Sequence, residues 1–238
     1  MTMNPATTTP HGAMARGAVG ATTLVVAGLV ALLNLAQVSP AEAGEKLTDS
    51  DEQQLDRGEL IVKTRPVEGY LWPEVTVYRW VAASPEEVIA VYADFDNQAG
   101  NLPHLVESRI VGRLSPNSFR VSYEYEVTGP NERYTVMATV SRAAGGFQVT
   151  WELLKARYMR RLVGRIKVEA QGSGAFIEYT NAVDPGFFGG RLGSPETTVT
   201  QLRETVQALA TYVERLRAGQ QPKLKALTDA LKSMLDGV

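Results

Sequence analysis

The stretch SPETTVTQLRETVQALATYVERL, residues 194–216, decides the fold of this chain. Ser194, Pro195 and Glu196 are typical of the N-cap, the first position and the first turn of an α-helix. The apolar residues that follow recur every three or four positions, at Val199, Leu202, Val206, Leu209, Val213 and Leu216. They share one stripe of a helix about 30 Å long, and this stripe must lie against another element.

Strand-like alternation fills the part of the chain before this helix. Between residues 119 and 127, aromatic or branched side chains take every second position and polar ones the positions between. Six further runs are typical of strands, over residues 75–81, 106–113, 134–140, 147–153, 162–169 and 175–183. Strands and helices do not alternate, which argues against a doubly wound parallel sheet. The pattern predicts an α+β fold, a curved antiparallel sheet of about six or seven strands against the C-terminal helix.

The composition narrows the classes of function. The 238 residues are 44% hydrophobic and 21% charged with a net charge of -2, which gives no support for nucleic-acid binding. The chain has no cysteine, which excludes disulfides, thiol nucleophiles and thiolate metal sites. Its two histidines, His11 and His104, are too few for a zinc site built on several histidines. We therefore expect no metal ion and no cofactor.

Residues 1–43 have the features of a secretory signal peptide. Arg16 precedes an apolar run over residues 18–35, and the small residues Ala41 and Ala43 come just before Gly44. The alternative is an uncleaved N-terminal anchor, since the run approaches the length that spans a bilayer. In either case we expect the folded part to be exported, to the periplasm or the medium, or held at the inner membrane.

The rest of the chain divides into three parts. Residues 44–72 are expected to form a linker and N-terminal arm, and residues 73–217 a single domain. Within that domain, Ser84, Pro85 and Glu87 predict the start of a short helix after the first strand. Residues 218–238 form an amphipathic tail that either docks on the domain or lies on a bilayer.

Five short segments carry a resemblance to a known superfamily. They are ASPEEV (83–88), YADF (92–95), LPHLV (102–106), AFIEY (175–179) and DPG (184–186). These segments and the order of the elements resemble the START-like helix-grip superfamily. That group includes START lipid-transfer domains, pollen-allergen-like carriers, polyketide cyclase-type domains and coenzyme Q-binding proteins. The resemblance implies that the long helix grips a curved sheet around an apolar cavity, and that the protein binds hydrophobic molecules.

The walls of such a cavity follow from the alternation and from the helix stripe. Pockets are largely apolar with a few polar anchors, and tyrosine hydroxyls could orient one polar head group. The candidate ligand-binding residues are Phe119, Tyr123, Tyr125, Tyr134, Val136, Trp151, Leu202, Val206 and Leu209. For any one of them, plain core packing is the alternative.

Two further features suggest contact with a membrane. Phe187 and Phe188 lie among the glycines of residues 186–190 and are candidates for a gate at the cavity mouth, or for side chains that only cover the core. A basic stretch could contact anionic head groups, or only protect a strand edge. It contains Lys155, Arg157, Arg160, Arg161 and Arg165.

Two charged or titratable residues are candidates for a polar role. Arg79 shares the face of Val77 and Val81, so it is a candidate ligand-binding residue if that face is inward. His104 could act as a base beside Asp94 or Asp96.

The leading hypothesis is an exported, monomeric carrier that encloses a lipid such as a sterol, a hopanoid or another isoprenoid. It would act without chemical turnover and touch membrane surfaces transiently. The alternatives are a cyclase- or dehydratase-type enzyme on the same fold and a quinone-chaperone-like binding module.

Overall fold

The computed structural model describes residues 47–127, 129–187 and 193–237. These residues belong to one compact unit, Val38–Val238. The predicted leader, residues 1–43, lies outside the described residues. Within the described part of the chain, no helix is both long enough and apolar enough to cross a membrane.

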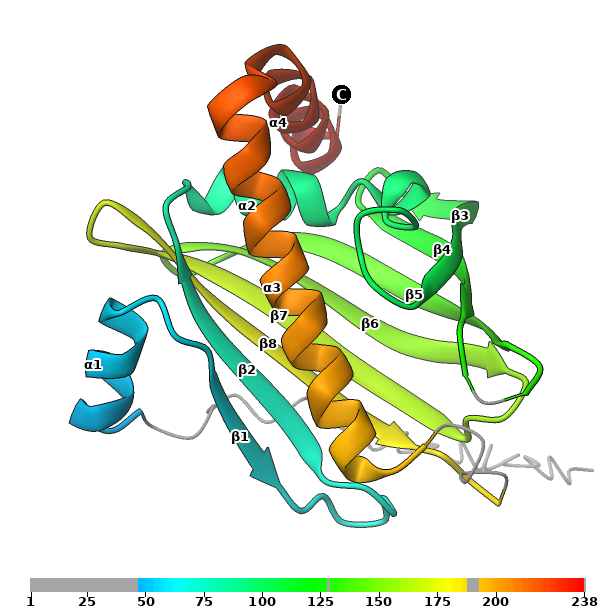
Figure 1. Ribbon diagram of the computed structural model, residues 1–238. Helices are drawn as coiled ribbons and strands as arrows, with labels where there is room; N and C mark the ends of the chain where they lie inside the picture. The colour runs from blue at the N-terminus through cyan, green and yellow to red at the C-terminus, as the bar shows by residue number, and fades with distance from the viewer. Residues whose placement is uncertain (1–46, 128, 188–192, 238) are drawn as a thin grey trace, which may run out of the picture. The chain divides into compact units, whose positions relative to one another are not determined.

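One antiparallel sheet of eight strands forms the body of the unit (Figure 1). The strands are β1 (Ile61–Arg65), β2 (Glu74–Val81), β3 (Leu105–Ser115), β4 (Ser118–Tyr125), β5 (Glu132–Ala143), β6 (Gly146–Ala156), β7 (Arg161–Gln171) and β8 (Gly174–Asp184). Their order in the sheet is β1-β2-β8-β7-β6-β5-β4-β3. Strands β3 to β8 are joined in sequence as hairpins, and β8 then pairs with β2. The predicted α+β class is confirmed.

The sheet has one strand more than the sequence predicts, and the extra strand is β1. Residues 44–72 were expected to form a linker and arm, but β1 lies within them and pairs with β2 over its whole length, from Ile61 opposite Tyr78 to Arg65 opposite Glu74. The run has five residues, and only the first of them is buried. It therefore lacks the long alternation of apolar and polar residues that would identify it as a strand.

The helices are α1 (Asp49–Asp56), α2 (Pro85–Tyr92), the 3₁₀ turn η1 (Phe95–Asn97), α3 (Pro195–Gly219) and α4 (Gln221–Asp236). Helices α2 and α3 begin at the residues that the sequence indicates, whereas α1 lies within the predicted linker. Ser84 caps α2 in a capping box with Glu87, and Ser194 accepts a hydrogen bond from the backbone of Thr197 at the start of α3.

Helix α3 lies across one face of the sheet, here called the inner face (Figure 1). Its stripe is buried at Leu202, Val206, Leu209, Val213 and Leu216, and each such side chain contributes about 1.5–3 kcal/mol when it leaves water. The close backbone contacts of α3 are with β2, α2 and α4, while α2 packs on β6, β7 and β8. Helix α2 therefore covers one end of the inner face, and α3 covers the β2 side.

The outer face of β2 is covered as well. Tyr78 packs with Leu55 of α1 and Ile61 of β1, and its ring stacks on Phe176 with 5.7 Å between the ring centres. Val77, which points the other way, is fully buried in the main core. Both faces of β2 are thus apolar, which is why alternation alone left its orientation open.

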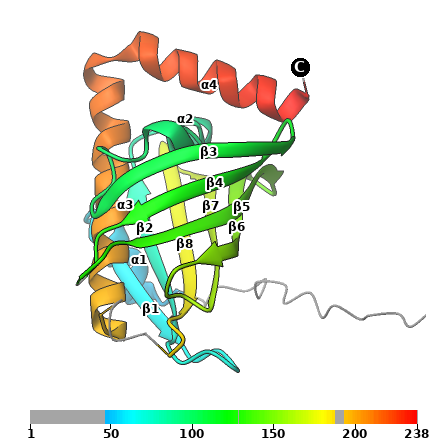
Figure 2. The ribbon, with the colours of Figure 1, turned by 90° about the vertical axis from the view of Figure 1, so that its right-hand side faces the viewer.

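The amphipathic tail docks on the domain as helix α4. Leu224 and Leu231 are buried in the main core. Lys232 lies 3.4 Å from the carboxylate of Glu86, and Arg142 lies 2.9 Å from Asp236. Figure 2 shows α4 turning away from the end of α3 and running past α2. Of the two alternatives for residues 218–238, the structure shows the helix docked on the domain.

Candidate ligand-binding cavity

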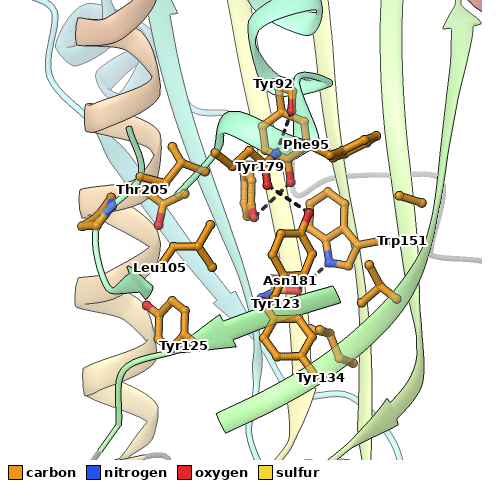
Figure 3. A pocket seen from close by; sticks show the side chains of 16 residues that line it. Tyr92, Phe95, Leu105, Tyr123, Tyr125, Tyr134, Trp151, Tyr179, Asn181 and Thr205 are labelled. Atoms are coloured by element: carbon orange, nitrogen blue, oxygen red, sulfur yellow. Dashed lines mark hydrogen bonds between the residues drawn. The ribbon is translucent and has the colours of Figure 1, made fainter. Parts of the chain in front are cut away.

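Two neighbouring cavities lie between α3 and the inner face of the sheet, with volumes of about 90 and 130 Å³. They share six lining residues: Tyr125, Tyr134, Leu162, Tyr179, Asn181 and Thr205. The first cavity also reaches α2 and the connection from α2 to β3 (Figure 3). The second reaches the Trp72 end of the sheet, where the β1–β2, β4–β5 and β6–β7 connections and the end of β8 lie.

Alternation along the strands places tyrosines in these walls. On β4, Tyr123 and Tyr125 continue the inward face that starts with the fully buried Val121. Tyr123 lies opposite Tyr134 of β5 in the sheet register, and the centres of the two rings are 5.2 Å apart. Tyr179 occupies the same face of β8. The apolar core therefore gives way to tyrosines toward one end of the strands.

A glycine lets the indole of Trp151 lie close over the neighbouring strand. Trp151 of β6 stands opposite Gly164 of β7, and a Cβ atom on Gly164 would come within 2.3 Å of the indole ring. The indole Nε1 donates a hydrogen bond of 3.3 Å to Oδ1 of Asn181. The absence of a side chain at residue 164 thus fixes one wall of the first cavity.

A hydrogen-bond network ties the α2–β3 connection to the sheet. The hydroxyl of Tyr123 donates to Oε1 of Gln98 over 2.9 Å, and Nε2 of Gln98 donates to the backbone oxygen of Tyr92 over 2.6 Å. The hydroxyls of Tyr92 and Tyr179 are 3.5 Å apart (Figure 3). The buried Gln98 is therefore held between a helix end and a strand.

Two tyrosine hydroxyls have no such partner. In the described part of the chain, neither Tyr125 nor Tyr134 makes a side-chain hydrogen bond, although both line both cavities. Both residues are half-buried, so their hydroxyls remain accessible from the cavities and can form a hydrogen bond with a ligand atom.

Burial keeps all of these phenols protonated at neutral pH. It raises the pKa of Tyr179 to about 12, with the hydrogen bond from Tyr92 opposing the shift. Burial also raises the pKa of Tyr92, Tyr123, Tyr125 and Tyr134 above the ordinary tyrosine value. The hydroxyls of Tyr125 and Tyr134, which have no hydrogen-bond partner in the described chain, can therefore donate to a ligand oxygen.

The cavities contain very little charge. Of the described residues that line the first cavity none is charged, and of those that line the second only Glu132 is charged. The carboxylate of Glu132 accepts hydrogen bonds from the backbone N–H groups of Arg157, over 2.8 Å, and Tyr158, over 2.9 Å. Burial raises the pKa of Glu132, and the backbone hydrogen bonds oppose this shift.

The structure brings six of the predicted wall residues to the cavities. The first cavity is lined by Tyr123, Tyr125, Tyr134, Val136 and Trp151, and the second by Tyr125, Tyr134 and Leu202. The other predicted wall residues lie elsewhere. Val206 and Leu209 are buried in the core, as is Phe119, whose ring packs on Phe95 with 5.6 Å between centres.

Neither Arg79 nor Phe187 lines either cavity. Nη1 of Arg79 donates to the backbone oxygen of Gly58 over 2.8 Å. Phe187 is 97% exposed, while Phe188 lies outside the described residues.

Several arginines of the predicted basic stretch bind other parts of the domain. Arg160 pairs with the buried Asp184, and Arg165 pairs with Glu178. Arg161 packs on the ring of Tyr70, 5.5 Å from its centre. Much of the stretch therefore has partners within the domain.

His104 lies beside a carboxylate, but not beside either of the two aspartates that the sequence suggests. Its Nε2 lies 2.8 Å from Oε2 of Glu204 on α3, and its backbone has a left-handed φ of 59°. Asp94 instead accepts from the side chain of Asn97, and Asp96 accepts from the backbone of Ile110. The expected pairing of His104 with either aspartate is wrong, because the α2–β3 connection turns the imidazole toward α3.

Sequence reasoning missed wall residues of two kinds. Tyr179 and Asn181 follow the alternation of Ile177 along β8, so the period of two could have identified them. Gln98 comes from a connection without any period, and Glu132 stands at the first position of a strand, where a charged residue is typical of a solvated end.

Comparisons with known proteins agree with this fold. A STAR-related lipid transfer protein from Xanthomonas axonopodis has a TM-score of 0.57 and 20% identity, over 65% of this chain and 93% of that one. Human STARD10 has a TM-score of 0.55 and 14% identity, over 81% of this chain and 90% of that one. Human StAR-related lipid transfer protein 5 has a TM-score of 0.54 and 9% identity, over 67% and 84%. At such identities the likeness shows the fold alone.

A comparison with curated protein sequences finds no match. Residues 73–214, more than half of the chain, match the family described as polyketide cyclase/dehydrase and lipid transport. This match confirms the resemblance carried by the short segments at the two ends of the domain. The chain therefore belongs to this START-like family, whose members share a helix-grip domain that binds ligands.

Proposed function

We propose that this protein is a carrier that encloses a hydrophobic molecule in the two cavities beneath α3, without chemical turnover. The observation that carries the proposal is the character of the walls, which combine aromatic and aliphatic side chains with a few neutral hydroxyl and amide groups. The structural relatives named as lipid transfer proteins support the same conclusion.

The neutral polar groups favour a ligand that carries oxygen. Tyr125 and Tyr134 offer hydroxyls with no hydrogen-bond partner in the described chain, and the shared wall also contains Asn181 and Thr205. Hydroxyl or carbonyl oxygens on an otherwise apolar skeleton would satisfy these groups. Sterols, hopanoids and other isoprenoids have this chemistry.

Loading requires the domain to open. The two cavities, of about 90 and 130 Å³, are small beside the 300–1,000 Å³ or so that is typical of pockets for drug-sized ligands. Exposed apolar residues at the Trp72 end include Leu71, which is 70% exposed, and Phe187 after β8. We propose that these residues touch a membrane while the ligand enters or leaves, and that the leader exports the protein to the periplasm.

The decisive experiment is extraction of the purified protein with organic solvent, followed by mass spectrometry of the extract. We expect a co-purifying lipid near one molecule per protein. A protein without lipid that turns over a substrate, and loses that turnover in His104→Ala, would overturn the carrier in favour of a cyclase or dehydratase.

A further inference from the structure

Glu132 is a carboxylate buried at the Trp72 end of the inner face. It is the first residue of β5 and shares the inward face of Tyr134 and Val136, two positions apart in each case. Only 1% of the residue is exposed, and it lines the second cavity. Its place in the fold therefore puts a formal negative charge beside the proposed ligand.

The charge of Glu132 has no cation beside it in the described part of the chain. The other fully buried carboxylate, Asp184, pairs with Arg160, but no ion pair involves Glu132. Both of its oxygens accept backbone N–H groups, from Arg157 and Tyr158. These hydrogen bonds offset part of the cost of burial, and a buried carboxylate without a counter-ion remains unfavourable.

The arginines closest in sequence are engaged elsewhere. Arg133 pairs with Glu124 on the other side of the sheet, at 2.9 Å. Nη1 of Arg157 donates to the backbone oxygen of Asn131 over 3.1 Å. Neither guanidinium therefore forms an ion pair with Glu132.

The walls around Glu132 suit a cation better than an anion. Four aromatic residues line the same cavity, namely Trp72, Tyr125, Tyr134 and Tyr179. Aromatic rings attract ammonium groups through their negative faces, most strongly where water is excluded. Among the residues that the structure describes, no lysine, arginine or histidine lines either cavity, so a carboxylate or phosphate ligand would meet only the charge of Glu132 there.

We propose that the second cavity binds a protonated amine at the polar end of the ligand, with Glu132 as its counter-ion. This inference rests on the proposed carrier function and narrows the cargo to hydrophobic molecules that carry an ammonium group. The apolar part of the molecule extends into the first cavity, between the tyrosines and Trp151.

Three probes of one chain length test the inference: octylamine, octan-1-ol and octanoate, each titrated by calorimetry at pH 7. Octylamine is protonated at this pH, as a lysine side chain is. We expect octylamine to bind about tenfold more tightly than octanol, and octanoate to bind most weakly, because hydrogen bonds to charged groups are stronger. If none of the three binds, the carrier function itself fails. If octanol binds as well as octylamine, only the ammonium site fails.

The variant Glu132→Gln should bring the ratio between octylamine and octanol close to one while octanol binding persists. The matched control is Glu124→Gln, which removes the same charge from a neighbouring carboxylate that lines neither cavity and should keep the ratio. Glu132→Gln loses one backbone hydrogen bond, so circular dichroism must show that it is folded. A folded variant that keeps the tenfold preference for octylamine over octanol would show that Glu132 only holds the β6–β7 connection through its backbone hydrogen bonds. This result would overturn the proposal.

A measurement on the unaltered protein provides a second test. Because burial raises the pKa of Glu132 above the ordinary value of 4.5, lowering the pH should protonate it while octylamine stays charged. The preference for octylamine over octanol should then fall as the medium becomes more acidic. A preference that stays constant while Glu132 titrates, followed by the NMR signal of its carboxyl carbon, contradicts the proposal.

Discussion

The absence of a side chain at Gly164 determines the shape of one wall of the first cavity. The indole of Trp151 occupies the space where a Cβ atom would be, and in this position it reaches the side-chain oxygen of Asn181. Any side chain at residue 164 must push the indole off the strand. The cavity wall and the packing of β6 on β7 therefore depend on the same glycine.

We expect Gly164→Ala to lower the free energy of unfolding by about 1–3 kcal/mol, the usual cost of overpacking. It should also shift the fluorescence of Trp151 and weaken the binding of octanol. Thermal unfolding and tryptophan emission measure both effects. The control is Gly112→Ala, because a Cβ atom there would meet the side chain of Arg120 at an ordinary 3.6 Å. Equal behaviour of the two variants would contradict this account of Gly164.

At the level of elements, the important contact joins α3 to the connection between α2 and β3. His104 and Glu204 form it, and their neighbours Pro103, Leu105 and Thr205 line the cavity. The backbone of His104 has a left-handed φ, a conformation that residues with a Cβ atom rarely adopt. The pair closes one side of the first cavity.

We expect Glu204→Gln to speed the release of a bound lipid several-fold while changing the unfolding free energy by no more than about 1 kcal/mol, since the pair is partly exposed. Stopped-flow dilution of a fluorescent fatty alcohol measures the release rate. Glu214→Gln, on an exposed position of the same helix, is the control. Release of the lipid at the same rate in both variants would show that the His104–Glu204 contact does not slow release.

The elements themselves could be predicted from the sequence to a large extent. The capping residues Ser84 and Ser194 are local signals, so the predicted starts of α2 and α3 are correct, whereas α1 was not predicted. Alternation marks the inward side chains of β4, β5 and β6. It could not distinguish Phe119, which packs on Phe95, from Tyr123, which lines the first cavity. This difference depends on the positions of α2 and η1 in the fold.

For the whole molecule, the distribution of exposed apolar residues matters for delivery of the cargo. Phe187 and Leu71 lie at the Trp72 end, which the second cavity reaches. Leu114, which is 56% exposed, lies at the opposite end, beside the β3–β4 hairpin. We therefore expect Phe187 and Leu71, and not Leu114, to touch a membrane while the cavity opens.

We expect Phe187→Asp to slow lipid transfer between vesicles about tenfold or more, because an aspartate strongly disfavours entry into the bilayer. The assay follows a fluorescent lipid moving from donor to acceptor vesicles. Leu114→Asp makes the same change at the other end and should transfer lipid at the normal rate. Unchanged transfer by Phe187→Asp would remove this residue from the membrane contact, and a loss in both variants would indicate a general effect of charge.

The docked helix α4 limits how the domain can open. Only Gln220 separates α4 from α3, and Leu224 and Leu231 anchor α4 in the core. We therefore expect the C-terminal end of α3 to stay in place, since Val213 and Leu216 are buried there, and the Ser194 end to be the part that moves when the cavities open. Thr198 and Gln201 near this end line the second cavity with Trp72 and Glu132, so a movement limited to it would admit a ligand at one end while the rest of the core stays closed.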